Sequence, residues 1–347
     1  MPGAEEARRI SELDGVRGVA ILSVIIAHSF SAPLLWAGVD LFFVLSGFLI
    51  TGILIRRKES GKPYFSYFYA RRARRIVLPY LLLLAVSSLL FGTAWTKYWY
   101  WFAFFATNIA GALHQYGHES LLPLWSLAVE EQFYLVWPLI VMVTRRRALL
   151  VVSLCILIAA PVLRGVATPW FHTYAPIYYL TPFRMDLLAS GAILAWVYRW
   201  KRSFFSRVSF WPNATLVGAA VLLVSLALVD PGFRTSANTI KGNVSIYAFT
   251  NIMATSLVVI ALQGGGMICQ LLRNPILRYA GKISYSMYLI HQGAQLLAVR
   301  FFPGRVASFG VSLALTVLYA TASWYGFERR LLAGRQTMIE SDTPVAT

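Results

Sequence analysis

LDGVRGVAILSVIIAHSF, residues 13–30, decides the fold class of this chain. It belongs to an apolar run over residues 15–34, and an α-helix needs about 20 such residues to cross the hydrocarbon core of a bilayer. Nine more runs of similar length follow, so the sequence predicts an all-α polytopic membrane protein with about ten transmembrane helices. The predicted spans are 15–34, 38–56, 76–92, 125–143, 148–164, 184–200, 210–229, 246–263, 283–302 and 307–327.

The composition also indicates a membrane protein. Hydrophobic residues make up 58% of the 347 residues and charged residues only 13%, whereas a soluble domain carries about 25% charged residues. The formal net charge of +17 can indicate nucleic-acid binding in a soluble protein. In a membrane protein, basic residues instead collect in cytoplasmic loops and set the orientation. We therefore expect the lipid bilayer, and no nucleic acid, as a partner.

Residues 98–113, YWYWFAFFATNIAGAL, are an ambiguous further span. If they do not cross, both termini are cytoplasmic and most basic residues lie inside, as the positive-inside rule requires. If they cross, every later basic cluster falls outside. Because Trp and Tyr suit the headgroup region, we predict a re-entrant or interfacial segment at 98–113.

The chain ends and the cysteines add three expectations. The apolar run after the polar N-terminus is long and lacks a small-residue cleavage site, so no removed signal peptide is expected. We expect one transmembrane domain over residues 1–333 and a short polar cytoplasmic tail over residues 334–347. Cys155 and Cys269 lack metal-ligand spacing, so we predict no metal site.

His28 is an ionisable residue inside the first predicted span. It lies eleven residues after Arg17, which is about 16 Å along a helix and roughly half way across the membrane. Ionisable groups in lipid are costly and often mark function. A neutral imidazole can act as a general base or simply pack against a hydrogen-bond partner, and the position alone leaves both roles open.

A basic cluster, RRARR, covers residues 71–75 at the cytoplasmic end of the third predicted span. The cluster can anchor the helix or bind anionic lipid. It can also bind the phosphates of a ligand such as coenzyme A, because each guanidinium offers a bidentate fork. The residue types alone do not decide between these roles.

Polar residues also occur near the predicted outer ends of spans. Glu130 and Glu131 are adjacent and point about 100° apart on a helix, so at least one of them faces the protein interior. They can pair with Arg184 or orient a substrate hydroxyl, and both alternatives stay open. Asp40, Ser46 and Asp186 are further candidates of this kind. Tyr285, Tyr288 and His291 follow one another along the ninth predicted span, with His291 at about the depth of His28.

The residues by themselves do not separate three functions. A polar interior with a basic cytoplasmic entrance fits an enzyme, and it also fits a secondary transporter or flippase for a glycan or small metabolite. No inverted repeat between the two halves supports the transporter. A non-catalytic membrane scaffold is a third reading, in which the buried polar residues would tolerate apolar replacement.

Six segments in order resemble the acyltransferase-3 family, over about Ile10 to Glu328. That resemblance implies ten core spans and transfer of an acyl group, commonly acetyl, from acyl-coenzyme A to a hydroxyl of a sugar, glycan or glycosylated metabolite. It also implies a bacterial cell-membrane location. No tightly bound cofactor is expected, and no oligomeric state is indicated. The segments are LDGVRGVAILSVIIAHSF, GVDLFFVLSGFLI, FYARRARRIVLPY, LWSLAVEEQFYLVWPL, FRMDLLASGAILA and GKISYSMYLIHQ.

The resemblance also implies roles for particular residues. The family histidine falls on His28 as general base, by direct transfer or through a covalent acyl-histidine, with Asp40, Glu130 or His291 orienting it. The family arginine pair falls on Arg72 and Arg75, with Arg71–Arg74 as a shifted alternative. The residues expected to hold coenzyme A are Arg17, Arg71, Arg72 and Arg75, and those expected near the acceptor are Trp125, Arg184, Tyr288 and His291.

The sequence departs from the family pattern in small ways. Ala128 stands where Ser is frequent, and Leu124 stands where a polar residue often precedes the Trp. Neither change removes a group that the chemistry needs. Some relatives carry an additional SGNH-type hydrolase domain, and we expect this chain to be the stand-alone form.

Overall fold

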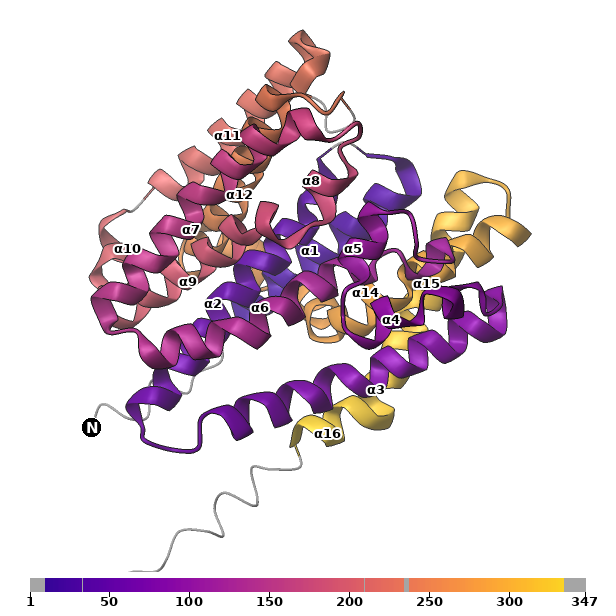
Figure 1. Cartoon of the computed structure of the whole chain (residues 1–347), viewed down its shortest axis with the longest axis horizontal. Helices are drawn as coiled ribbons and strands as arrows, with labels where there is room; N and C mark the ends of the chain where they lie inside the picture. The colour runs from indigo at the N-terminus through magenta and orange to yellow at the C-terminus, as the bar shows by residue number, and fades with distance from the viewer. Residues whose placement is uncertain (1–9, 33, 209, 234–236, 334–347) are drawn as a thin grey trace, which may run out of the picture.

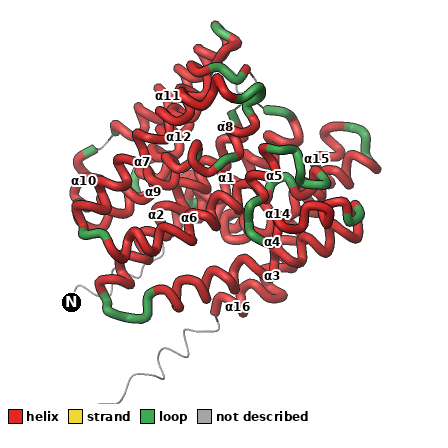
Figure 2. Tube along the Cα trace, viewed as in Figure 1, coloured by secondary structure: helices red, strands yellow, loops and turns green. Residues whose placement is uncertain are grey.

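The computed structural model describes residues 10–32, 34–208, 210–233 and 237–333, and these residues form helices and loops without a strand (Figure 2). Each of the ten predicted spans is one helix, so the all-α fold is confirmed. The predicted polar tail, 334–347, lies outside the described residues. The long helices are α1 Ser11–Phe30, α2 Gly38–Glu59, α3 Phe65–Phe91, α6 Leu124–Val143, α7 Arg146–Ala167, α9 Met185–Trp200, α11 Trp211–Val229, α12 Ile240–Gln263, α14 Pro275–Phe301 and α15 Arg305–Ser323.

Eight of these helices are long and apolar enough to cross a membrane. The other two are α9, which has 16 residues, and α14, which is longer but carries more polar side chains. Shorter helices connect the long ones. They include η1 Leu35–Ala37, α4 Trp99–Ala103, α5 Thr107–Ala112, α8 Ala175–Tyr179, α10 Ser203–Arg207, α13 Gly266–Leu272 and α16 Arg329–Ala333.

The ambiguous segment 98–113 does not form a spanning helix. It contains α4 with five residues and α5 with six, and Phe105 between them has φ 49°. At about 1.5 Å per residue, neither helix covers more than about a third of the roughly 30 Å hydrocarbon core. This agrees with the predicted re-entrant or interfacial segment.

The directions of packed helices agree with the same prediction. α1 and α14 run parallel, because Gly18 meets the Leu277 backbone near their starts and the rings of His28 and His291 meet near the other end. These are the first and ninth long helices, so they point the same way only if residues 98–113 do not cross. The cytoplasmic placement of both termini stays a prediction.

Close helix contacts bring together segments that are far apart in the sequence. A Cβ atom on Gly18 would lie 2.0 Å from the Leu277 carbonyl oxygen, and one on Gly47 would lie 2.0 Å from that of Leu188. Small residues of this kind allow membrane helices to approach backbone to backbone. In Figure 1, α1, α2, α6 and α14 occupy the middle of the molecule, α3 and α16 lie along one edge, and α11 and α12 lie at the opposite edge.

Candidate active site

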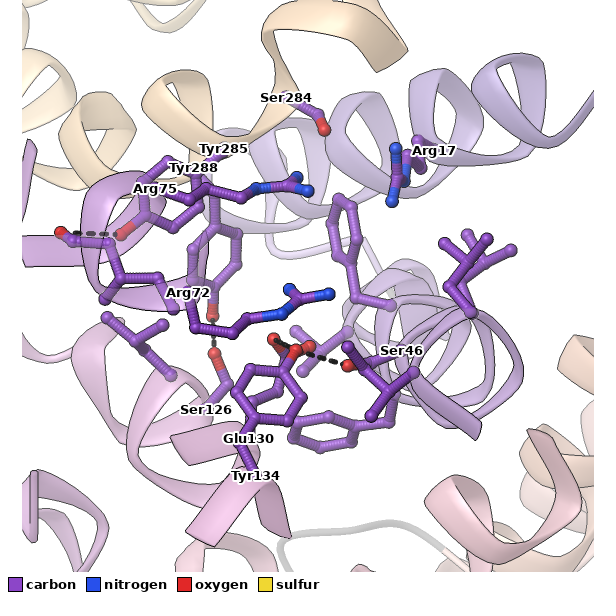
Figure 3. Close-up of a pocket in the computed structure, with 18 of the residues that line it drawn as sticks. Arg17, Ser46, Arg72, Arg75, Ser126, Glu130, Tyr134, Ser284, Tyr285 and Tyr288 are labelled. Atoms are coloured by element: carbon purple, nitrogen blue, oxygen red, sulfur yellow. Dashed lines mark hydrogen bonds between the residues drawn. The ribbon is translucent and has the colours of Figure 1, made fainter. Parts of the chain in front are cut away.

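A cavity between α1, α2, α3, α6 and α14, here called the arginine cavity, holds most of the charged candidates. The guanidinium groups of Arg17, Arg72 and Arg75 point into one space (Figure 3). These side chains come from α1 and α3, and Glu130 from α6 faces the same space. The remaining polar side chains in its wall are Ser46, Ser126, Tyr134, Ser284, Tyr285 and Tyr288.

Helix geometry selects two of the four clustered arginines. Residues three apart share a face of a helix, which pairs Arg72 with Arg75 and leaves Arg71 and Arg74 on another face. Arg72 and Arg75 are half-buried and line the cavity, whereas Arg71 and Arg74 are exposed. Arg71 donates a 2.8 Å hydrogen bond to the hydroxyl of Tyr67. The structure therefore places Arg71 outside the cavity that Arg17, Arg72 and Arg75 line.

A hydrogen-bond chain lies in the wall of the arginine cavity. The Tyr134 hydroxyl donates to the Glu130 carboxylate at 2.8 Å. Because a phenol has one hydroxyl hydrogen, which here goes to Glu130, the Ser46 hydroxyl must be the donor in its 2.5 Å bond to the Tyr134 oxygen. The Arg72 guanidinium lies over the Tyr134 ring, 4.8 Å from its centre. Glu130 thus faces the same cavity as Arg72, whereas Arg184, its expected ion-pair partner, pairs with Asp40 instead.

A second cavity, here called the histidine cavity, contains His28. Its walls come from the end of α1, from η1, from the starts of α2 and α6, from α8 and from α14, so several of them are connecting segments. The residues that line it are His28, Trp36, Val39, Leu122, Pro123, Trp125, Tyr174, Tyr178, Tyr179, Tyr288 and Gln292. Aromatic rings therefore surround one imidazole.

The hydrogen bonds of His28 determine which ring nitrogen is available. Nδ1 lies 2.8 Å from the Val24 carbonyl oxygen, and because a carbonyl only accepts, Nδ1 carries the hydrogen. The lone pair is then on Nε2, as a general base requires. The Gln295 side chain donates to the His28 carbonyl at 2.8 Å and ties this end of α1 to α14.

His291 packs directly against His28. The two ring centroids are 5.0 Å apart in an edge-to-face arrangement. Nδ1 of His291 lies 2.7 Å from the Tyr288 carbonyl oxygen, and its buried Nε2 has no hydrogen-bond partner within the described structure. His291 therefore packs against the His28 ring and is not among the residues that line either cavity.

The structure corrects the expected depth of His28. α1 begins at Ser11 and ends at Phe30, so His28 lies in its last turn, about 26 Å along the axis from Ser11. The predicted mid-span position was measured from Arg17, on the assumption that Arg17 marks the edge of the membrane. Arg17 instead lies inside the helix and faces the arginine cavity.

Asp40 and Arg184 form a buried ion pair away from both cavities. Both are 0% exposed; Arg184 donates to Asp40, and the Thr250 hydroxyl donates to Asp40 at 2.6 Å. These contacts occupy the Asp40 carboxylate, so it does not orient His28, and Arg184 does not reach an acceptor directly. Asp40, expected as a catalytic residue, and Arg184, expected near the acceptor, thus form one buried ion pair that lines neither cavity.

Arg184 still acts on the histidine cavity through its walls. Its guanidinium lies 5.4 Å from the Tyr178 ring centre and 5.9 Å from that of Trp125, close enough for cation–π attraction. A second buried pair, Arg164 with Asp186 at 2.8 Å, lies nearby. The Asp40–Arg184 pair therefore supports the aromatic wall from the side that faces away from the cavity.

Several cavity residues were not predicted from the sequence. Trp36, Tyr178, Tyr179 and Gln292 line the histidine cavity, and none of them is among the predicted site residues. The aromatic run in YAPIYY, residues 174–179, was the available signal. Among the described residues, no group of three or more His, Cys, Asp or Glu side chains could hold a metal ion.

A family model described as an acyltransferase domain matches residues 10–326. The chain belongs to the acyltransferase-3 family. The match covers all six segments on which the resemblance was based, so that interpretation is confirmed. It also covers every residue that lines the two cavities. No solved protein structure matches the chain.

Curated relatives are bacterial proteins. The putative peptidoglycan O-acetyltransferase YrhL of Bacillus subtilis is 31% identical over 321 residues, which are 82% of this chain and 48% of that protein. The O-acetyltransferase OatA of Staphylococcus aureus is 26% identical over 356 residues, 91% of this chain and 56% of the relative. The putative O-acetyltransferase SACOL0978 of the same species is 24% identical over 358 residues, 92% and 57% respectively. The chain spans about half the length of these relatives.

Proposed function

We propose that this chain is a membrane-embedded O-acyltransferase. It moves an acyl group, in the simplest case acetyl, from a coenzyme A thioester in the arginine cavity to a hydroxyl of a glycan or glycosylated molecule in the histidine cavity. The observation that carries the proposal is the free Nε2 of His28 in a cavity that meets the arginine cavity at Tyr288. The family assignment favours this activity over the transporter that the sequence left open.

The charges of the arginine cavity support an anionic donor. Arg17, Arg72 and Arg75 face a space whose acidic lining residue is Glu130, so the cavity has an excess of positive charge. Guanidinium groups bind phosphates in bidentate fashion, and the nucleotide end of coenzyme A carries several phosphates. Arg17 lies eleven residues before His28 on α1, or about 16 Å along the axis, so the donor must extend toward the far end of the helix.

The hydrogen bonding of His28 supports a general-base role. His28 Nε2 takes the proton of the acceptor hydroxyl while the hydroxyl oxygen attacks the thioester carbonyl carbon. The new C–O bond forms, the C–S bond breaks, and the proton on Nε2 passes to the leaving thiolate. A base positioned in this way contributes about 10²–10⁴-fold to the rate. In the neutral ring the proton acceptor is Nε2, because Nδ1 donates to the Val24 carbonyl.

The walls of the histidine cavity support a glycan acceptor. Trp125, Tyr178 and Tyr179 present aromatic rings and phenol hydroxyls, which offer an apolar face and a polar edge to one ligand. A sugar ring has both features. The names of two relatives, peptidoglycan O-acetyltransferase and O-acetyltransferase, fit this class of acceptor.

The test is transfer by the purified protein in liposomes. Labelled acetyl-coenzyme A and a panel of cell-wall glycan fragments are supplied, and products are identified by the added acyl mass. The wild-type chain is expected to acylate at least one glycan fragment, and His28→Ala is expected to insert normally without doing so. Full activity in His28→Ala would contradict the general-base role, and transfer that does not depend on a coenzyme A thioester would contradict the donor.

A further inference from the structure

Two residues line both cavities. Val39 and Tyr288 occur in the wall of the arginine cavity and in that of the histidine cavity. Val39 is a buried aliphatic residue of α2, whereas Tyr288 is a half-buried residue of α14 with a hydroxyl group. The side chain of Tyr288 is therefore the larger part of the partition between the two spaces.

Hydrogen bonds hold the Tyr288 phenol at this partition. Its hydroxyl lies 2.6 Å from the Ser126 hydroxyl and 3.2 Å from the Pro123 carbonyl oxygen. Ser126 lines the arginine cavity, and Pro123 lines the histidine cavity. The phenol is thus fastened at the boundary by one group from each side, as Figure 3 shows for the bond to Ser126.

The surroundings of Tyr288 restrict how it can move. His291 Nδ1 donates to the Tyr288 carbonyl and fixes the backbone. The Tyr288 ring packs against Phe42 in a T-shaped contact at 5.9 Å and against His291 at 5.5 Å. Since α14 is a continuous helix here, rotation of the side chain is the simplest motion that opens the partition. That rotation requires loss of the bond to Ser126.

We propose that Tyr288 is a gate between the two cavities and that it selects short acyl groups. This inference rests on the proposed function, in which the donor phosphates and the base lie on opposite sides of the partition. With the phenol bonded to Ser126, the thioester stays apart from the acceptor. When the phenol swings away, the acyl end passes beside Val39 and reaches His28. A longer acyl chain needs the volume that the ring still occupies, so it passes poorly.

A labelling experiment tests the gate without enzyme activity. Cys155→Ser and Cys269→Ser remove the native thiols, and Gln292→Cys places one thiol in the histidine cavity. A membrane-impermeant maleimide is applied from the side on which the arginine cavity opens, in oriented vesicles. Tyr288→Ala is expected to raise the labelling rate from that side by at least about tenfold, because it removes both the ring and its hydrogen bonds.

The matched control is Tyr279→Ala. Tyr279 lies on the same helix, and its hydroxyl is 2.9 Å from the Thr321 hydroxyl on α15, away from both cavities. Tyr279→Ala should therefore leave the labelling rate of the introduced thiol unchanged relative to the parent protein that carries Gln292→Cys. Tyr288→Phe keeps the ring but loses the hydroxyl, so labelling should rise by roughly twofold to tenfold, the equivalent of one neutral hydrogen bond. This variant keeps the test valid if Tyr288→Ala does not fold.

Acyl selection is measured with acetyl- and hexanoyl-coenzyme A. Tyr288→Ala should raise the ratio of kcat/KM for hexanoyl over acetyl by at least about tenfold, since each methylene accommodated is worth roughly tenfold or more. An unchanged labelling rate in both Tyr288 variants would overturn the gate, and an unchanged ratio in an active Tyr288→Ala enzyme would overturn the selection. If the wild-type chain transfers no acyl group at all, the proposed function fails, while the labelling result still decides whether Tyr288 separates the cavities.

Discussion

The arginine cavity and the histidine cavity differ in the chemistry of their walls. The first lies between long helices and directs three guanidinium groups toward one space, while the second is built largely from connecting segments and places aromatic rings around an imidazole. One suits a phosphate-bearing molecule, and the other suits a neutral molecule with hydroxyls. Under the proposed function, donor and acceptor therefore occupy separate environments and react only where the two cavities meet.

The largest expected effect comes from replacing His28, the proposed general base in the histidine cavity. His28→Ala should lower kcat by about 10²–10⁴-fold, because it removes the group that accepts the hydroxyl proton. Single-turnover acyl transfer measures this loss. His114→Ala is the control, because His114 is a histidine of a connecting turn outside both cavities. A reduction of less than about tenfold in kcat for His28→Ala would place the base elsewhere.

The next effect concerns the wall of the histidine cavity. Asp40→Ala should lower the free energy of unfolding by about 3–5 kcal/mol, because it leaves the buried Arg184 guanidinium without its counter-charge. Thermal unfolding in detergent measures this change. Replacing both partners, with Asp40→Leu and Arg184→Met, should recover much of the loss. A fully stable Asp40→Ala protein would show that the ion pair does not hold this wall.

The helices, the arginine cluster and the Asp40–Arg184 pair show how much of the fold and of the site the sequence predicts. The ten helices follow from apolar runs, whereas the choice of Arg72 with Arg75 over Arg71 with Arg74 follows from the family resemblance and not from their spacing, which is the same in both pairs. The pairing of Asp40 with Arg184 did not follow, because it joins residues 144 positions apart. Which helices pack together depends on backbone approach at positions such as Gly47, and a hydropathy pattern does not record that approach.

The position of His28 shows a second limit. Its residue type and its family counterpart pointed to catalysis, yet its depth was misplaced, since a polar residue inside a helix can mimic the membrane edge. Part of the aromatic wall around it, Tyr178 and Tyr179, comes from α8, a five-residue helix that carries no span signal. Short connecting segments of this kind take their positions from tertiary packing, so the sequence predicted one cavity better than the other.

A smaller effect should distinguish the arginines that line the arginine cavity from the exposed arginines beside them on α3. Arg72→Ala should raise the KM for the acyl donor by roughly 10–100-fold, as expected for loss of a hydrogen bond to a charged group. Arg71→Ala should change it little, because Arg71 is exposed and bonds Tyr67. Equal effects of both substitutions on the donor KM would remove the distinction between the two faces of α3.

The smallest effect should come from the hydrogen-bond chain in the arginine cavity. Tyr134→Phe removes the hydroxyl that joins Ser46 to Glu130, and we expect roughly a twofold to tenfold loss in kcat/KM for the donor. The acceptor KM should not change. A change confined to the acceptor KM would connect this chain to the histidine cavity instead.

The most direct test of the two-cavity account is the sidedness of transfer in oriented proteoliposomes. Acyl-coenzyme A is supplied on the side of the basic loops and the glycan acceptor on the opposite side, and the acylated glycan is then quantified. The account predicts product in this arrangement and none when donor and acceptor are exchanged between sides. Product that forms only with both substrates on the basic side would contradict it.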